Sequence, residues 1–193
     1  MAARPDENYT IRRQVFKFFG AGFDIYGSTG EMIGHCHQKA FKLKEDLRIY
    51  TDKTKSEELL VITTPKVIDF SAKYDVKLPT GESIGAIQRK GLKSMLRDTW
   101  LVFNAEGREI AKLTEDSAFK ALVRRFVDYA QVLMPQSFHL KREDGSDIAR
   151  FRQHFNPFIF RLGINIQDPD DEIDDLVILA LGCLISAIEG RQG

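Results

Sequence analysis

The sequence is poor in cysteine and has no excess of charge of either sign. Cys36 and Cys183 are the only cysteines among 193 residues and lie far apart. This excludes a disulfide framework and favours a reducing, cytoplasmic location. Residues 1–13 contain no apolar stretch of the kind that a signal peptide requires. Because 28 Lys and Arg residues balance 28 Asp and Glu residues, we expect no nucleic-acid partner.

The sequence also lacks an apolar segment long enough to cross a bilayer. The uncharged run Leu176–Ile188 would form a helix about 20 Å long at about 1.5 Å per residue. A bilayer core needs about twenty apolar residues. We therefore predict a buried helix over residues 172–189 rather than a membrane anchor, which is the alternative. The acidic stretch Asp168–Asp175 favours a helix N-terminus immediately before the run.

This predicted helix is apolar all round, as expected of a helix enclosed by protein. Its small residues Gly182, Cys183, Ser186 and Ala187 would let strands approach one side closely. The large residues that we expect to fill a core are Leu176, Val177, Ile178, Leu179, Leu181, Leu184, Ile185 and Ile188.

The rest of the chain is rich in strand signals. In Asp69–Leu78 apolar and polar residues alternate, which indicates a strand with one buried and one wet face. Four stretches share a further plan: a strand runs into a polar turn, then come a glycine, an isoleucine three residues later, and a small residue. They are "FDIYGSTGEMIGHC", "YDVKLPTGESIGAI", "WLVFNAEGREIAKL" and "FHLKREDGSDIARF". Each is typical of a β-hairpin whose glycine supplies a positive φ.

Further strands are predicted at residues 14–19, 47–51, 59–64 and 158–166, which gives roughly ten to twelve strands. A barrel of that width leaves a space that its own side chains do not fill. We therefore predict a mainly β protein, a closed antiparallel barrel around the C-terminal helix. Residues 91–98 and 117–134 are the two interruptions with helical character, and the second has an amphipathic period.

No motif indicates a catalytic, metal or cofactor site. The four histidines lie in no recognisable triad motif, so we expect no enzyme activity and no cofactor. His35 and His37 share one face of a predicted strand without a third ligand, and an exposed strand face explains them better than a metal site. Asp168, Asp170 and Glu172 have EF-hand-like spacing, but Ile173 replaces the required glycine.

The most suggestive polar feature is a basic run between two predicted hairpins. Several cations at one turn could bind one phosphorylated headgroup, and the amphipathic segment could contribute two more. A solvated surface is the alternative. The candidate phosphate-binding residues are Arg89, Lys90, Lys93, Arg97, Arg124 and Arg125.

The repeated Gly-x-x-Ile-small hairpins, then "FNPFIFRLGINI", acidic residues and a terminal apolar helix resemble the phospholipid scramblase and LURP-one-related families. This resemblance implies the tubby C-terminal fold, a closed barrel of about twelve strands around a central helix. It would comprise one domain over residues 14–190, after an arm at residues 1–13.

The resemblance implies a non-enzymatic role, in which phosphoinositide headgroups or a membrane surface are bound. A protein-interaction scaffold with a protein partner and a genuine scramblase are the alternatives. If Gly163 marks the same turn as in animal scramblases, Phe158 and Phe160 replace acidic calcium ligands. Phenyl rings cannot coordinate Ca²⁺, so calcium-driven scrambling is not expected.

Overall fold

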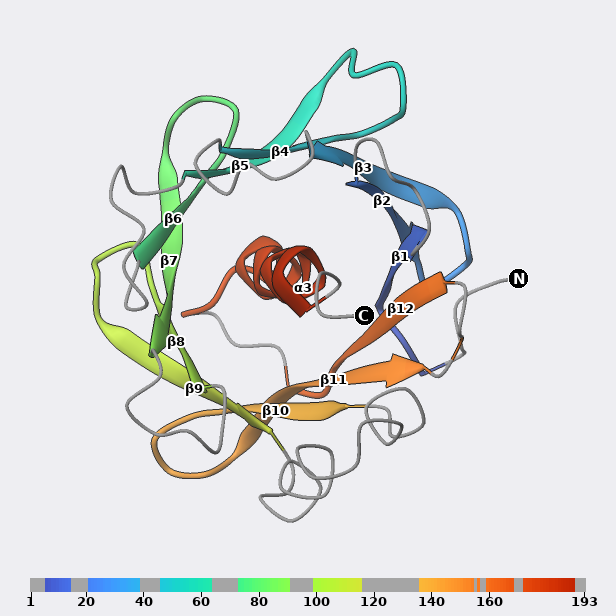
Figure 1. Cartoon of the computed structure of the whole chain (residues 1–193). Helices are drawn as coiled ribbons and strands as arrows, with labels where there is room; N and C mark the ends of the chain where they lie inside the picture. Colours follow the sequence, from blue (N-terminus) through green and yellow to red (C-terminus); the bar gives the residue numbers. More distant parts are fainter. Residues whose placement is uncertain are drawn as a thin grey trace.

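The computed structural model describes residues 6–14, 21–38, 46–63, 73–90, 99–115, 136–154, 156, 159–168 and 172–189. Within these residues, twelve antiparallel strands form a closed barrel around one helix, α3 (Asp175–Glu189) (Figure 1). The predicted fold class is therefore confirmed. The strands are β1 (Tyr9–Gln14), β2 (Ala21–Gly27), β3 (Met32–Gln38), β4 (Leu47–Tyr50), β5 (Glu58–Thr63), β6 (Lys73–Lys77), β7 (Ser83–Lys90), β8 (Thr99–Phe103), β9 (Glu109–Glu115), β10 (Ser137–Lys141), β11 (Asp147–His154) and β12 (Ile159–Ile166).

The barrel closes where the first strand meets the last. Strand β1 pairs with β12 from Tyr9↔Ile164 to Gln14↔Ile159, and with β2 on its other edge. The barrel therefore begins at Tyr9 rather than at residue 14, because β1 supplies the pairing that leaves no free sheet edge. Of the strand predicted at residues 14–19, only residue 14 is described. Residues 91–98 and 117–134 lie outside the described residues.

The four predicted hairpins share one turn geometry. Their glycines Gly30, Gly81, Gly107 and Gly145 have φ between 79° and 90°, in the left-handed region. In each turn the glycine N–H donates to the carbonyl three residues earlier at 2.9–3.0 Å. The repeated isoleucine is the extra residue of a β-bulge, because the register skips it in every hairpin. The bulge then turns the next residue into the barrel.

The repeat also sets the width of the barrel interior. Its last, small residue faces inward near the turn, at Gly34, Gly85, Ala111 and Ala149. Its first residue is aromatic and faces inward farther from the turn, at Phe23, Tyr74, Trp100 and Phe138. Near each turn the small residue is paired with a buried aliphatic residue, Ile25, Val76, Val102 or Leu140, and farther from the turn an aromatic residue faces inward.

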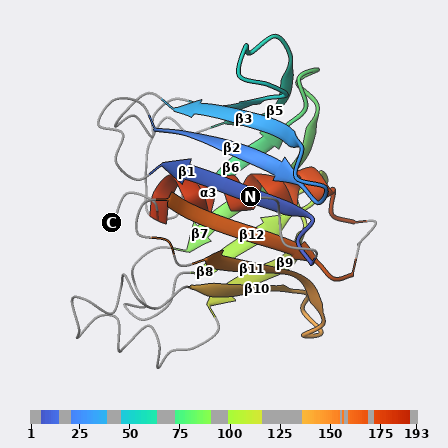
Figure 2. The same ribbon diagram turned by 90° about the vertical axis from the view of Figure 1, so that its right-hand side faces the viewer.

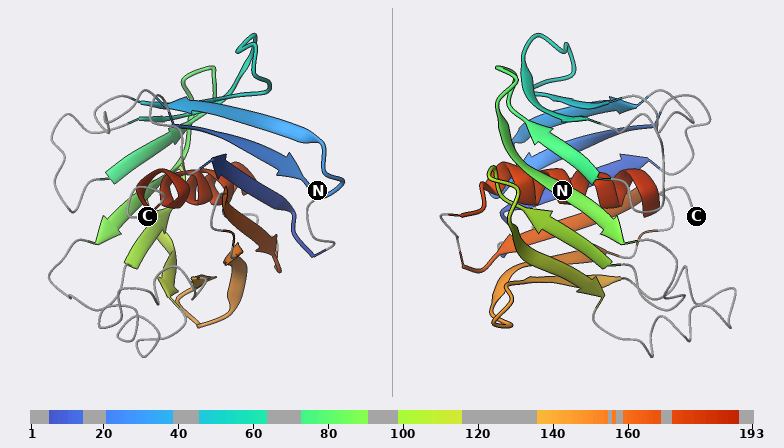
Figure 3. Two further views of the ribbon diagram at one scale, coloured as in Figure 1. Left: turned by 45° about the vertical axis from the view of Figure 1, so that its right-hand side comes forward. Right: turned by 90° about the vertical axis from the view of Figure 1, so that its left-hand side faces the viewer.

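Helix α3 runs along the barrel axis with strands on all sides (Figures 2 and 3). Val177 is 1% exposed and Leu181 is fully buried, so the apolar run of the sequence lies in the core. A Cβ on Gly182 would lie 2.5 Å from Ile164 Cδ1, and one on Gly85 would lie 3.0 Å from Val177 Cγ2. The small residues predicted to admit close approach do so at Gly182. Among the described helices, none has the length and apolar character needed to span a membrane.

Both ends of α3 are capped by charged residues. Asp174 accepts a hydrogen bond from the Leu176 N–H at 2.8 Å and is the N-cap residue, so the helix begins at Asp175 rather than at residue 172. At the other end, Arg13 of β1 donates to the Ser186 carbonyl at 3.3 Å. A carboxylate at the N-terminus and a guanidinium at the C-terminus both complement the helix dipole.

Candidate functional site: the two ends of the barrel

The chain connectivity gives the barrel two distinct ends. At the hairpin end, the described connections are the turns at 28–31, 51–57, 78–82, 104–108 and 142–146, together with 167–168 and 172–174. The far end is defined here as the three residues of each strand that lie farthest from these turns. Helix α3 begins at the hairpin end and ends at the far end (Figure 2).

The hairpin end is acidic. Its connections contain ten acidic residues and four basic ones. The acidic residues are Glu31, Asp52, Glu57, Glu82, Glu106, Glu143, Asp144, Asp168, Glu172 and Asp174. These carboxylates surround the positive end of the α3 dipole. Their favourable interaction with the dipole explains part of the acidic excess.

Most cations at the hairpin end have a carboxylate partner. Arg108 bonds Glu172 at 2.7 Å and Arg142 bonds Asp168 at 2.9 Å. Asp168 and Glu172 are therefore engaged with arginines, and Asp170 lies outside the described residues. The EF-hand-like spacing is thus explained by helix entry and ion pairing. Among the described residues, no group of three or more His, Cys, Asp or Glu side chains could hold a metal ion.

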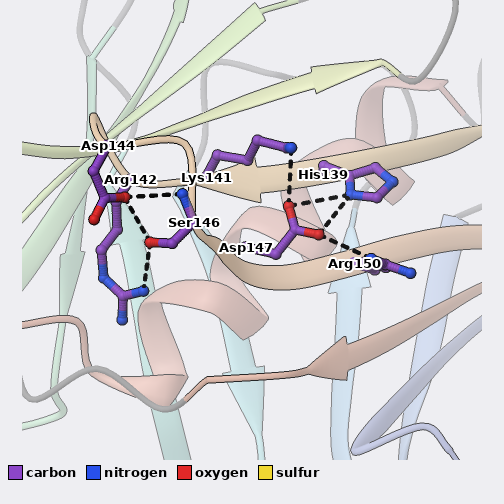
Figure 4. A network of polar contacts seen from close by, with 7 residues as sticks. All are labelled: His139, Lys141, Arg142, Asp144, Ser146, Asp147 and Arg150. Carbon is purple, nitrogen blue, oxygen red and sulfur yellow. Dashed lines mark hydrogen bonds and ion pairs between the residues drawn. The ribbon is translucent and has the colours of Figure 1, made fainter.

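A larger network lies on the outer wall just beyond the fifth hairpin turn (Figure 4). Asp147 accepts from Arg150 at 2.9 Å, from Lys141 at 3.2 Å and from His139 at 3.3 Å. The Arg150 hydrogen bond is the main cause that lowers the pKa of Asp147 to about 2, with Lys141 and His139 adding to it. One carboxylate thus contacts an arginine, a lysine and a histidine on this part of the wall.

His35 is likewise paired rather than available to a metal. Its Nδ1 lies 2.7 Å from Asp24 Oδ1, and Lys53 lies 2.9 Å from the other Asp24 oxygen. Burial opposes ionisation of Asp24, but the hydrogen bonds from Lys53 and His35 still lower its pKa. The side chain of His37 lies outside the described residues. His35 is therefore a partly exposed residue of β3 that is held by Asp24.

The two thiols lie inside the barrel. Burial raises the pKa of Cys36 to about 12 and that of Cys183 well above its ordinary value. Since the thiolate is the reactive form, both cysteines are inert core residues in the folded protein.

The far end is basic. The three outermost residues of the twelve strands include eight Lys and Arg residues, against only Asp75 and Glu115. These cations are Arg12, Arg13, Arg48, Lys73, Arg89, Lys90, Arg152 and Arg161. Among the described residues, charge is therefore divided along the barrel axis.

Two residues of the predicted basic run belong to this end. Arg89 and Lys90 are the last residues of β7, not part of a turn. They point to opposite faces of the strand: Arg89 lies over the Trp100 ring, 5.5 Å from its centroid, whereas Lys90 is exposed. Only Lys90 thus offers an outward charge. Lys93, Arg97, Arg124 and Arg125 lie outside the described residues, so the predicted cluster stays a prediction.

The structure also brings together cations that the sequence did not single out. Arg12 of β1 and Arg161 of β12 are direct cross-strand neighbours on the outer wall. Alternation alone indicates that each faces outward, because each lies between inward-facing residues. Their proximity depends on barrel closure, which joins residues 149 positions apart in the chain.

The comparison with protein families agrees with this architecture. The model of the LURP-one-related family matches residues 35–185, from β3 into α3. The chain belongs to the LURP-one-related family, which lies in the tubby-like superfamily and is linked to scramblases. The family is generally non-enzymatic. No curated protein and no solved structure matches the chain.

Proposed function

We propose that this LURP-one-related barrel is a cytoplasmic, non-enzymatic module that binds anionic phospholipid headgroups peripherally through its far end. The observation that carries the proposal is the division of charge between the two ends. The far end has eight cations and two carboxylates among its outermost strand residues, and the hairpin end has the opposite balance.

This division would orient the molecule on an anionic surface. Each Lys or Arg close to such a surface contributes about 1 kcal/mol of attraction, and the attraction decays over a Debye length of about 8 Å in physiological salt. The far end would therefore face the lipid, and the acidic hairpin end would point away from it. A barrel with mixed charge at both ends would have no such preference.

The proposal leaves α3 inside the barrel. Its residues Val177–Ala187 are buried among the strands, and exposing them to lipid would require the barrel to open. Headgroup binding through surface cations needs no such rearrangement. It is therefore favoured over lipid scrambling by an inserted helix.

Vesicle flotation tests the proposal. The purified chain is mixed with phosphatidylcholine vesicles that contain, or lack, phosphatidylinositol bisphosphate, at low and at physiological salt. We expect flotation only with the anionic lipid, and weaker flotation at higher salt. The double variant Lys90→Gln/Arg152→Gln should reduce partitioning at least about tenfold, since two cations contribute about 2 kcal/mol.

The matched control removes the same charge from the hairpin end. Lys53→Gln/Lys55→Gln should float like the unmodified chain, because those lysines would point away from the vesicle. Equal losses in the two double variants would contradict the proposed orientation. No flotation of the unmodified chain at low salt, together with a protein partner recovered by pull-down, would favour the scaffold function instead.

A further inference from the structure

We infer that the outer wall of the barrel holds a site for a single phosphate group, formed by Arg12 and Arg161 with Arg152 at its edge. The site goes beyond the proposed membrane association, because it needs neither a surface nor the other cations of the far end. Three adjacent strands contribute to it, β1, β12 and β11.

The register places the two central arginines side by side. Arg12 lies directly opposite Arg161 in the β1–β12 pair. Both face outward, because Ile11 on one strand and Leu162 on the other are fully buried in the barrel core. Directly opposed residues have Cβ atoms about 4.5–5.5 Å apart, and like charges in that position are destabilising. A neutral protein thus places two positive charges together where an opposite charge would be favourable.

The nearby carboxylates are already engaged elsewhere. Asp24, which lies opposite Arg12 on the β2 side, is bonded to His35 and Lys53. Glu7 accepts from the Thr10 hydroxyl at 2.8 Å and contacts the His154 ring. Within the described part of the chain, the guanidinium groups of Arg12, Arg152 and Arg161 form no ion pair. No described carboxylate therefore forms an ion pair with these three arginines.

Arg161 carries the clearest sign of a missing ligand. Its Nε atom is buried and has no hydrogen-bond partner in the described structure. An unsatisfied buried donor costs about 1–3 kcal/mol, and a charged one more. The Nε–H and an adjacent Nη–H form the edge of the guanidinium that binds two oxygens of one phosphate. A phosphate at this edge would satisfy the donor and separate the two like charges.

The surroundings fix the arginines for this role. The guanidinium of Arg12 lies over the Tyr26 ring, 5.4 Å from its centroid, which restricts its position. The N-terminal segment is held against β12, where the Asn8 N–H donates to the Ile164 carbonyl at 2.8 Å. Glu7 of that segment covers Gly163, where even a Cβ would lie 2.1 Å from its carboxylate oxygen. The wall beside the site is therefore closely packed, and preorganised donors bind an anion with less entropic cost.

The matching ligand is a phosphate monoester group. Two guanidinium groups with a third on the diagonal match a doubly charged anion with several acceptor oxygens. Such a group occurs both on small phosphorylated metabolites and on the headgroups of phosphorylated lipids. The chemistry of the site is the same for either source, so the test must distinguish them.

The test follows the side-chain Nε–H resonances of the arginines in the full-length chain by NMR. Inorganic phosphate is titrated at constant ionic strength, and inositol trisphosphate is titrated separately as a soluble headgroup. We expect the Arg161 resonance to shift and saturate, whereas that of Arg108, which is paired with Glu172, stays in place. Affinity should fall at least about tenfold in Arg12→Gln and in Arg161→Gln, as for the loss of a charged hydrogen bond.

Arg161→Lys separates a built site from general attraction, since it keeps the charge but loses the two-donor edge. Binding should weaken in Arg161→Lys and remain unchanged in Arg108→Gln, the matched control. Equal affinity of Arg161→Lys and the unmodified chain, or an Arg161 resonance that moves no more than that of Arg108, would overturn the inference. Loss of flotation on phosphatidylinositol bisphosphate vesicles in Arg161→Gln would identify a lipid source, and unchanged flotation a soluble one. Saturable phosphate binding without vesicle flotation would refute the proposed function and leave the site standing.

Discussion

The two ends of the barrel differ in the residues that line them and in how their charges are paired. At the hairpin end each of the four repeats places a glycine or alanine inward, their turns share one geometry, and cations such as Arg108 and Arg142 are matched by carboxylates. At the far end each repeat places an aromatic residue inward, and the arginines Arg12, Arg152 and Arg161 have no carboxylate partner among the described residues. The helix dipole explains acid at the first end and Arg13 at the second.

The dipole does not account for the remaining far-end cations. A helix terminus carries the equivalent of about half an elementary charge, which Arg13 alone offsets. Arg48 is paired with Glu58, whereas Arg12, Arg152 and Arg161 form no ion pair among the described residues. Charge at the hairpin end thus contributes to the fold, and we propose that these three far-end arginines serve a ligand.

The largest effect is expected from removal of α3, the helix that extends between the two ends. Termination of the chain after Asp175 removes Val177, Leu181 and the other buried aliphatic residues of α3. Full burial of each large aliphatic side chain contributes about 1.5–3 kcal/mol, so the total loss equals or exceeds a typical stability of about 5–15 kcal/mol. We expect no cooperative unfolding transition by circular dichroism. A truncated chain that still melts cooperatively would show that the helix is dispensable to the barrel.

The next effect contrasts the linings of the two ends. Trp100→Ala at the far end should cost about 3–5 kcal/mol, because it leaves a large cavity in a fully packed layer. The loss in free energy of unfolding is measured by urea unfolding. The signal is far-ultraviolet circular dichroism, because the variant lacks the tryptophan.

The opposite substitution, from a small to a large residue, tests the hairpin end. There Ala149→Leu should cost about 1–3 kcal/mol by overpacking, since Ala149 is fully buried. Unfolding in urea again gives the free energy of unfolding. If Ala149→Leu proved neutral, the interior near the turns would be wider than its small residues indicate.

The smallest effect concerns the paired charges near the hairpin end. The pKa of Asp147 is lowered to about 2 in the folded protein, below about 3.9 for an unfolded aspartate. Its contribution to stability is therefore present above about pH 4 and is lost as the pH falls toward about 2. Because the group is close to solvent, we expect Asp147→Asn to cost at most about 1 kcal/mol at neutral pH. The free energy of unfolding is measured in urea at neutral pH and at about pH 2. Its decrease on acidification should be smaller in Asp147→Asn than in the unmodified chain, and an identical decrease would contradict this role.

Much of the fold could be predicted from residue patterns, because the determinants are local. A glycine three residues before an isoleucine specifies a turn with positive φ, and a thirteen-residue apolar run is too short for a bilayer. The aromatic residue that opens each repeat was visible in the same alignment of hairpins. Its role as the wide layer of the lining was missed, because it requires the register of the closed barrel.

The candidate site could be predicted much less well. The basic run at residues 89–97 was conspicuous because its cations are close in sequence. However, adjacent strand residues point to opposite faces, so Arg89 lies over Trp100 and Lys90 faces outward. Arg12 and Arg161 were inconspicuous for the opposite reason, since they come from the first and last strands.

The hairpins, the buried helix and the closed barrel follow from residue patterns, since turn chemistry and apolar periodicity act between near neighbours. Which charges meet depends on the folded barrel. Strand pairing between the chain's first and last strands sets Arg12 beside Arg161, and barrel closure gathers acidic turns at one end and cations at the other. Electrostatic energy depends on distance in space, and distance along the chain does not reveal it.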